Sequence, residues 1–154
     1  MNSRPVTRLL LVVLGVFFGL MPGVWAAFRP ESFYTDFPVV RPAWVAVDGP
    51  YNEHLIRDVG AMFLALAVIA LVAAATGRAG QARLAGLAWL VFSTLHFAYH
   101  VTHLHVYDTL DQWLTVASQV TSILVGLAVV LIPPAPDGRR DQVRVRPERA
   151  PEPS

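Results

Sequence analysis

The sequence of 154 residues contains no cysteine and no lysine, and all twelve of its basic residues are arginine. The lack of cysteine excludes disulfides, thiolate nucleophiles and zinc or iron–sulfur sites with cysteine ligands. The lack of lysine excludes a Schiff-base enzyme. Charged residues make up only 15% of the chain, whereas soluble domains have about 25%. This composition is typical of a membrane protein, and we expect no nucleic-acid partner.

Four long apolar runs follow one another along the chain. Leu9–Phe28, Val59–Thr76 and Trp113–Pro136 carry no charge, and Leu84–Tyr99 is interrupted only by His96. About 20 helical residues cross a hydrocarbon core about 30 Å thick. The sequence therefore predicts an all-α membrane protein in which residues 1–133 form a four-helix bundle. We expect its helices at about residues 7–27, 54–76, 82–104 and 110–132.

The arginines are unevenly divided between the two sides that four crossings create. One side has nine, namely Arg4, Arg8, Arg78, Arg83, Arg139, Arg140, Arg144, Arg146 and Arg149. The other side has three, namely Arg29, Arg41 and Arg57. Cytoplasmic loops are enriched in basic residues. Both termini are therefore predicted to be cytoplasmic, with residues 134–154 forming a disordered Pro- and Arg-rich tail.

The first apolar run has three glycines at four-residue spacing, Gly15, Gly19 and Gly23. Such spacing lets another helix approach closely. That helix could belong to this chain, to a second copy or to a partner in a membrane complex. A cleaved secretory signal is the alternative for residues 1–26, but the apolar run is longer than the 7–15 residues expected of a signal core.

Residues 28–53 join the first two helices and are rich in both proline and aromatic residues. Disordered linkers are poor in aromatics, so the segment is predicted to form an ordered external cap. Val39-Val40 and the segment 44–47 could form short strands in it. The alternative is an aromatic belt that lies on the lipid headgroups.

Four of the five histidines lie close together, at the end of the third apolar run. His96, His100 and His103 are spaced i, i+4 and i+7 and share one helix face, whereas His105 points away from it. At about 1.5 Å per residue from Leu84, His96 lies about 18 Å into the hydrocarbon core. An ionisable group at this depth is expected to face the bundle interior. If its role is purely structural, His96 is expected to bond Ser93, Gln119 or Thr121 there.

The start of the second helix adds further polar residues at the same end of the bundle. The candidate ligand-binding residues are therefore His54, Arg57, Asp58, His96, His100 and His103. In one interpretation a single metal ion binds to His54, Asp58, His96 and His100, which would suit a metal-dependent oxidoreductase or hydroxylase. In another, the imidazoles bind a lipophilic molecule such as a quinone or a lipid. Haem is disfavoured because no other helix supplies a facing histidine at this depth.

A purely structural interpretation is equally open. Arg57 would then pair with Asp58, Asp108 or Asp111 and join helix ends, and the protein would be a non-catalytic subunit or scaffold. No set of catalytic residues is predicted.

Residues Asn52–Gly60, with the sequence NEHLIRDVG and an Ala/Leu-rich helix after them, resemble the start of the second helix in the DoxX-like superfamily. The resemblance covers about residues 57–132. It implies a four-helix bundle in a bacterial plasma membrane. Members that give the superfamily its name are linked to a thiosulfate:quinone oxidoreductase, but the superfamily is functionally mixed, so the resemblance implies the fold rather than an activity.

Overall fold

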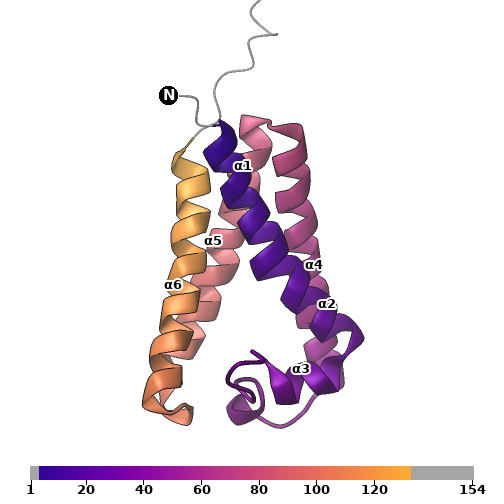
Figure 1. The fold of residues 1–154 in the computed structure, drawn as a ribbon, viewed down its shortest axis with the longest axis vertical. Helices are drawn as coiled ribbons and strands as arrows, with labels where there is room; N and C mark the ends of the chain where they lie inside the picture. The colour runs from indigo at the N-terminus through magenta and orange to yellow at the C-terminus, as the bar shows by residue number, and fades with distance from the viewer. Residues whose placement is uncertain (1–3, 133–154) are drawn as a thin grey trace, which may run out of the picture.

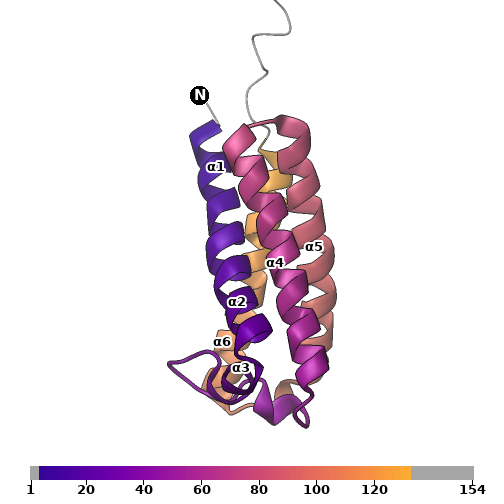
Figure 2. The same ribbon diagram turned by 90° about the vertical axis from the view of Figure 1, so that its right-hand side faces the viewer.

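Four long apolar helices run antiparallel in the structure, a computed structural model in which residues 4–132 are described (Figures 1 and 2). The first is continuous and consists of α1 (Arg4–Val12), a π-helical section η1 (Val13–Leu20) and α2 (Met21–Phe28). The others are α4 (Glu53–Thr76), α5 (Ala79–Thr102) and α6 (Thr109–Leu131). Each is long and apolar enough to cross a membrane. The predicted all-α bundle of four membrane-spanning helices is confirmed, and the protein is a multi-pass membrane protein. The predicted tail, residues 134–154, lies outside the described residues.

Local signals explain where the helices begin and end. The side chain of Asn52 accepts a hydrogen bond of 3.1 Å from the backbone N–H of Leu55 at the start of α4. Asp108 caps α6 in the same way through the N–H of Asp111, at 2.9 Å. These bonds satisfy backbone donors that have no partner within the helix. Gly77 ends α4 with a positive φ of 64°, a conformation that glycine adopts without steric cost.

The glycine stripe of the first helix packs against α4 of the same chain. A Cβ atom at Gly15 would lie 2.7 Å from the side chain of Leu71, and one at Gly19 would lie 2.8 Å from Cβ of Ala67. Gly23 is buried too and faces Phe63 and Leu64. The close neighbour that the spacing predicts is therefore α4. The use of Gly15, Gly19 and Gly23 by a second copy or another partner stays a prediction, although α4 already covers these residues.

Helices α5 and α6 form a second close pair. A Cβ at Gly86 would lie 3.0 Å from the carbonyl oxygen of Gly126, so this pair also depends on small residues at its contact. The buried hydroxyls of Ser93 and Ser122 form a hydrogen bond across it. Trp89, only 1% exposed, fills the centre of the main core. In Figure 1, α2 and α6 diverge toward the end of the bundle where α3 lies, here called the cap end.

The segment between the first helix and α4 is ordered, as predicted, but its structure is helical. It contains α3 (Pro30–Asp36) and a short 3-10 helix η2 (Ala46–Asp48). The predicted strands at 39–40 and 44–47 are wrong, since no strand occurs within residues 4–132. Proline fixes φ near the helical value and suits the first position of a helix, which favours a helix from Pro30 onward. Phe33 of α3 is buried with Ala26 and Ile56, so the segment folds onto the bundle.

The cap is fastened to the start of α6 by charge and by ring contacts. Arg41 forms salt bridges with both Asp108 and Asp111. The hydroxyl of Tyr107 donates a hydrogen bond of 3.0 Å to the carbonyl oxygen of Trp44, and the two rings lie 6.2 Å apart. The expected pairing of Arg57 with an aspartate is wrong. Arg57 instead bonds Glu53, one turn before it, and the carbonyl of Ala27.

This attachment predicts a dependence of stability on pH. The N–H of Asp111, followed by Arg41, lowers the pKa of the Asp108 carboxyl below its usual value. A lowered folded-state pKa gives stability that is present above the unfolded-state pKa and is lost as the pH falls through the folded-state value. Acidification from pH 7 to pH 3 should therefore lower the unfolding temperature in detergent less in Asp108→Asn than in wild type. Asparagine keeps the oxygen that caps α6 but has no carboxyl group to protonate. An equal fall in both proteins would contradict this account of the cap.

Candidate functional site

A seam of buried and half-buried polar side chains follows α5 and α6, and the bond between Ser93 and Ser122 sets its register. Residues three and seven positions away on a helix lie on nearly the same face. His96 follows Ser93 by three residues, and Gln119 precedes Ser122 by three. His100 follows Ser93 by seven residues, and Thr115 precedes Ser122 by seven. Because the helices are antiparallel, His96 lies level with Gln119 and His100 lies level with Thr115.

Three atoms of this seam are buried without a hydrogen-bond partner: Nδ1 of His100, Oγ1 of Thr115 and Oε1 of Gln119. Thr115 as a whole is only 2% exposed. A buried polar atom without a partner costs about 1–3 kcal/mol, and such atoms are rare in native proteins. Three such atoms on one interface make the seam the candidate functional site.

The seam is flanked by a continuous series of aromatic rings. His96 stacks on Phe92 with ring centroids 5.2 Å apart, and its other ring contact is with His100, at 4.6 Å. Phe92 in turn touches Phe63 of α4, at 5.1 Å. His100 lies 6.3 Å from Tyr107, which leads on to the cap through Trp44. The rings therefore connect the middle of the bundle with its cap.

The expected hydrogen bonds of His96 are not formed. Ser93 is bonded to Ser122, and Thr121 donates to the carbonyl of Ala117 in its own helix. His96 instead contacts the rings of Phe92 and His100, which lie one turn before and one turn after it in α5, and this corrects the predicted partners. Gln119, the third predicted partner, keeps an unpaired oxygen.

Tyr107 closes the seam at the cap end. Its side chain is buried, with 7% exposure, and burial raises the pKa of its phenol above the usual value. Its backbone carbonyl accepts a hydrogen bond of 3.0 Å from the side-chain amide of Gln112. Tyr107 is thus a neutral and firmly held hydrogen-bonding group between the cap and the bundle.

The remaining histidines lie outside the seam. His103 ends α5, where its Nδ1 lies 2.8 Å from the carbonyl oxygen of Tyr99 and its ring stacks on the Tyr99 ring. His105 is exposed in a short 3-10 helix, η3 (Leu104–Val106). Nε2 of His54 lies 3.3 Å from a carboxylate oxygen of Asp58 on α4, and 89% of the His54 side chain is exposed.

The structure therefore separates the predicted site residues, with His103 at the end of α5 and the other five in two further places. His96 and His100 belong to the seam, whereas His54, Arg57 and Asp58 lie on the exposed start of α4. Within residues 4–132, no three His, Asp or Glu side chains are grouped so that they could hold a metal ion. The proposed metal set His54, Asp58, His96 and His100 is not brought together.

Sequence reasoning missed Thr115, Tyr107 and Trp44 as parts of the site. A signal for Thr115 was present, because Ser93 and His100 repeat the same seven-residue spacing as Ser122 and Thr115. Aligning these two spacings on antiparallel helices would have placed Thr115 opposite His100. Trp44 carried no such signal, because its position depends on the path of the cap.

Fold and site together define a four-helix multi-pass membrane protein with a capped polar seam between two of its helices. Comparison of the chain with protein-family models, with curated proteins and with solved structures gave no match.

Proposed function

We propose that this protein binds the polar head of a lipophilic molecule of the quinone class in the seam between α5 and α6. The observation that carries the proposal is the set of three buried polar atoms without a partner, on His100, Thr115 and Gln119. The proposal assigns binding and no catalytic step.

The chemistry of these atoms matches both redox forms of a quinone. The hydroxyl of Thr115 donates and accepts, the ring nitrogen of His100 does either according to its tautomer, and the oxygen of Gln119 accepts. Quinone carbonyls accept hydrogen bonds, and quinol hydroxyls also donate them. The flat rings of Phe92, His96 and Tyr107 offer surfaces on which a quinone ring would pack.

The depth of the seam favours a ligand that reaches it through the membrane. His96 lies six residues before the end of α5, which corresponds to about 9 Å along the helix. The cap covers the same end through Trp44 and Tyr107. The resemblance to the DoxX-like superfamily is part of the same proposal and agrees with a quinone ligand.

Arginines support an orientation with both termini in the cytoplasm of a bacterial cell. At the end opposite the cap, here called the terminal end, Arg8, Arg78 and Arg83 are exposed. Carboxylates within residues 4–132 are Glu31, Asp36, Asp48, Glu53, Asp58, Asp108 and Asp111, and all belong to the cap end. Arg41 and Arg57 at that end are paired with carboxylates. The positive-inside rule then places the terminal end in the cytoplasm and the seam in the outer half of the plasma membrane.

Binding of decylubiquinone tests the proposal. The full-length protein would be placed in nanodiscs of phosphatidylcholine, and quenching of tryptophan fluorescence would be measured against quinone concentration. His100→Leu should weaken binding by about three- to tenfold, because a hydrogen bond is worth about 0.5–1.5 kcal/mol. His105→Leu, a change of the same kind at an exposed site, should leave the affinity unchanged. Equal affinities in wild type and His100→Leu, or no saturable quenching, would contradict the proposal.

A further inference from the structure

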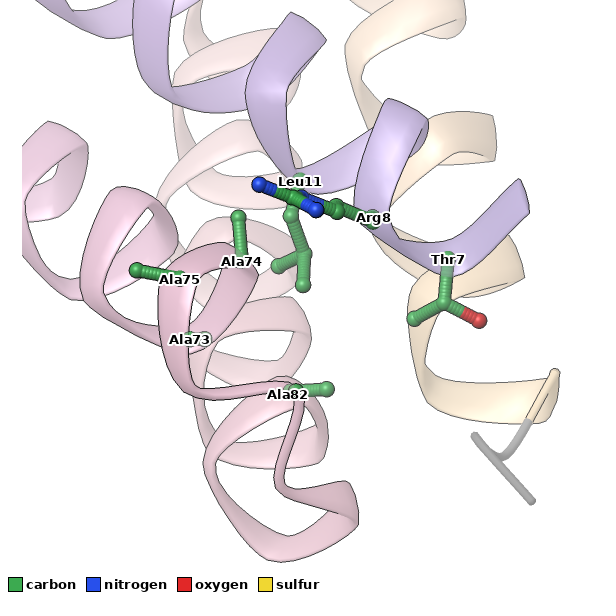
Figure 3. Close-up of a pocket in the computed structure, with 8 residues that line it drawn as sticks. Thr7, Arg8, Leu11, Ala73, Ala74, Ala75 and Ala82 are labelled. Atoms are coloured by element: carbon green, nitrogen blue, oxygen red, sulfur yellow. The ribbon is translucent and has the colours of Figure 1, made fainter. Parts of the chain in front are cut away.

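A second candidate site lies at the terminal end, far along the bundle from the seam. Figure 3 shows a pocket between α1, the end of α4 and the start of α5. Its volume is about 170 Å³, and it is open on one side. Its lining residues are Thr7, Arg8, Leu11, Ala73, Ala74, Ala75, Gly77 and Ala82.

Most of the lining residues of this pocket are apolar. Leu11, Ala73 and Ala82 are 1–2% exposed and belong to or adjoin the main core. The small alanine side chains leave room that an extended hydrocarbon chain could fill.

Arg8 supplies the polar part of the pocket. Its side chain extends from α1 toward the α4 side in Figure 3, and it forms no salt bridge with the carboxylates of residues 4–132. Those carboxylates all lie at the cap end. A guanidinium group binds phosphate through paired hydrogen bonds. The rim of the pocket therefore favours an anion.

We propose that this pocket binds an anionic phospholipid of the membrane. Its phosphate contacts Arg8, and the first part of one acyl chain lies against Ala74, Ala75 and Leu11. α4 ends at Thr76 and α5 begins at Ala79, so the pocket lies at the level where a lipid headgroup meets its acyl chains. One basic residue near an anionic surface is worth about 1 kcal/mol. The proposal does not depend on the binding of a quinone.

Lipid retention tests the site. The full-length protein would be purified from mixed bilayers that contain equal amounts of phosphatidylglycerol and phosphatidylcholine with the same acyl chains. Native mass spectrometry would then measure which lipid stays bound. Wild type should retain phosphatidylglycerol preferentially, and Arg8→Gln should lower this preference about fivefold. Arg83→Gln removes the same charge at the same end without touching the pocket and should change the preference less than twofold.

The apolar part of the site has its own variant. Ala75 is exposed at the rim, so Ala75→Leu should fill the pocket without disturbing the core and should lower lipid retention to a similar degree as Arg8→Gln. Equal loss in Arg8→Gln and Arg83→Gln would overturn the proposal in favour of diffuse surface charge. Full lipid retention in Ala75→Leu would overturn it too. So would displacement of the bound lipid by glycerol phosphate as readily as by phosphatidylglycerol, or a dimer without bound lipid in which Arg8 is covered.

Discussion

Gly60→Ala is expected to destabilise the bundle by about 3 kcal/mol, which is at the upper end of the cost of overpacking. An added Cβ at this position would lie 2.5 Å from the backbone nitrogen of Ala27 and 2.9 Å from its Cα. These are backbone atoms of the neighbouring helix, so no side-chain rotation relieves the contact. The first helix would have to move away from α4, which would weaken the packing of the cap cluster around Ala26 and Ile56. Unfolding by sodium dodecyl sulfate from mild detergent, followed by circular dichroism, would measure the change.

Gly80→Ala is the matched control, because a Cβ there meets nothing within 4 Å. Alanine is favoured over glycine in helices by about 1 kcal/mol, so this variant should be as stable as wild type or more stable. The two identical substitutions should therefore have opposite signs. If Gly60→Ala were neutral, the first helix and α4 could not be packed as closely as the structure has them.

Thr115→Val is expected to stabilise the fold by about 1 kcal/mol and to weaken quinone binding about three- to tenfold. Valine keeps the branched shape of threonine and removes a buried hydroxyl that has no partner. The folded state thereby loses a desolvation penalty, and a bound quinone loses a hydrogen bond. Opposite effects on stability and on affinity distinguish a binding residue from a structural one. Denaturant unfolding and the quenching titration, performed on the same preparation, would measure both.

Ser122→Ala should instead lower the stability of the fold and leave quinone binding nearly unchanged. Its hydroxyl is bonded to that of Ser93, so its removal leaves a buried Ser93 without a partner and should cost about 0.6–1 kcal/mol in a membrane bundle. Quinone affinity should change little. If Thr115→Val destabilised the protein as Ser122→Ala does, the hydroxyl of Thr115 would have a structural partner and the proposed site would lose one of its groups.

The four helices were predictable because membrane-spanning length is a simple physical requirement. Runs such as Val59–Thr76 need only be long and apolar, and capping residues such as Asn52 mark their ends. The cap was harder. Val39 and Val40 have strand-forming side chains, but they are 74% and 87% exposed, and the described part of the chain contains no strand that could pair with them. Residues 37–40 form a turn, in which Val39 has a φ of 44°, and the 3-10 helix η2 occupies the end of the second predicted strand.

The candidate site was only partly predictable for a different reason. The spacing of His96 and His100 placed both on one helix face, and depth placed His96 inside the bundle. Spacing along one helix carries no information about which residue of another helix lies opposite. The level of Thr115 follows from the contact of Ser93 with Ser122, and the fastening of Arg41 to Asp108 and Asp111 follows from the path of the cap. His54 and Asp58 share the end of the bundle with His96 but face outward.

The central claim is that a quinone-class molecule hydrogen-bonds with the buried residues between α5 and α6. Nitrogen NMR of histidine-labelled protein in phosphatidylcholine nanodiscs, recorded with and without saturating decylubiquinone, tests this claim at the level of single atoms. Signals would be assigned by comparison with His100→Leu and His105→Leu. The Nδ1 signal of His100 is expected to shift on addition of the quinone while the signals of exposed His105 stay in place. An unchanged His100 signal at saturation, or equal shifts in both histidines, would contradict the account.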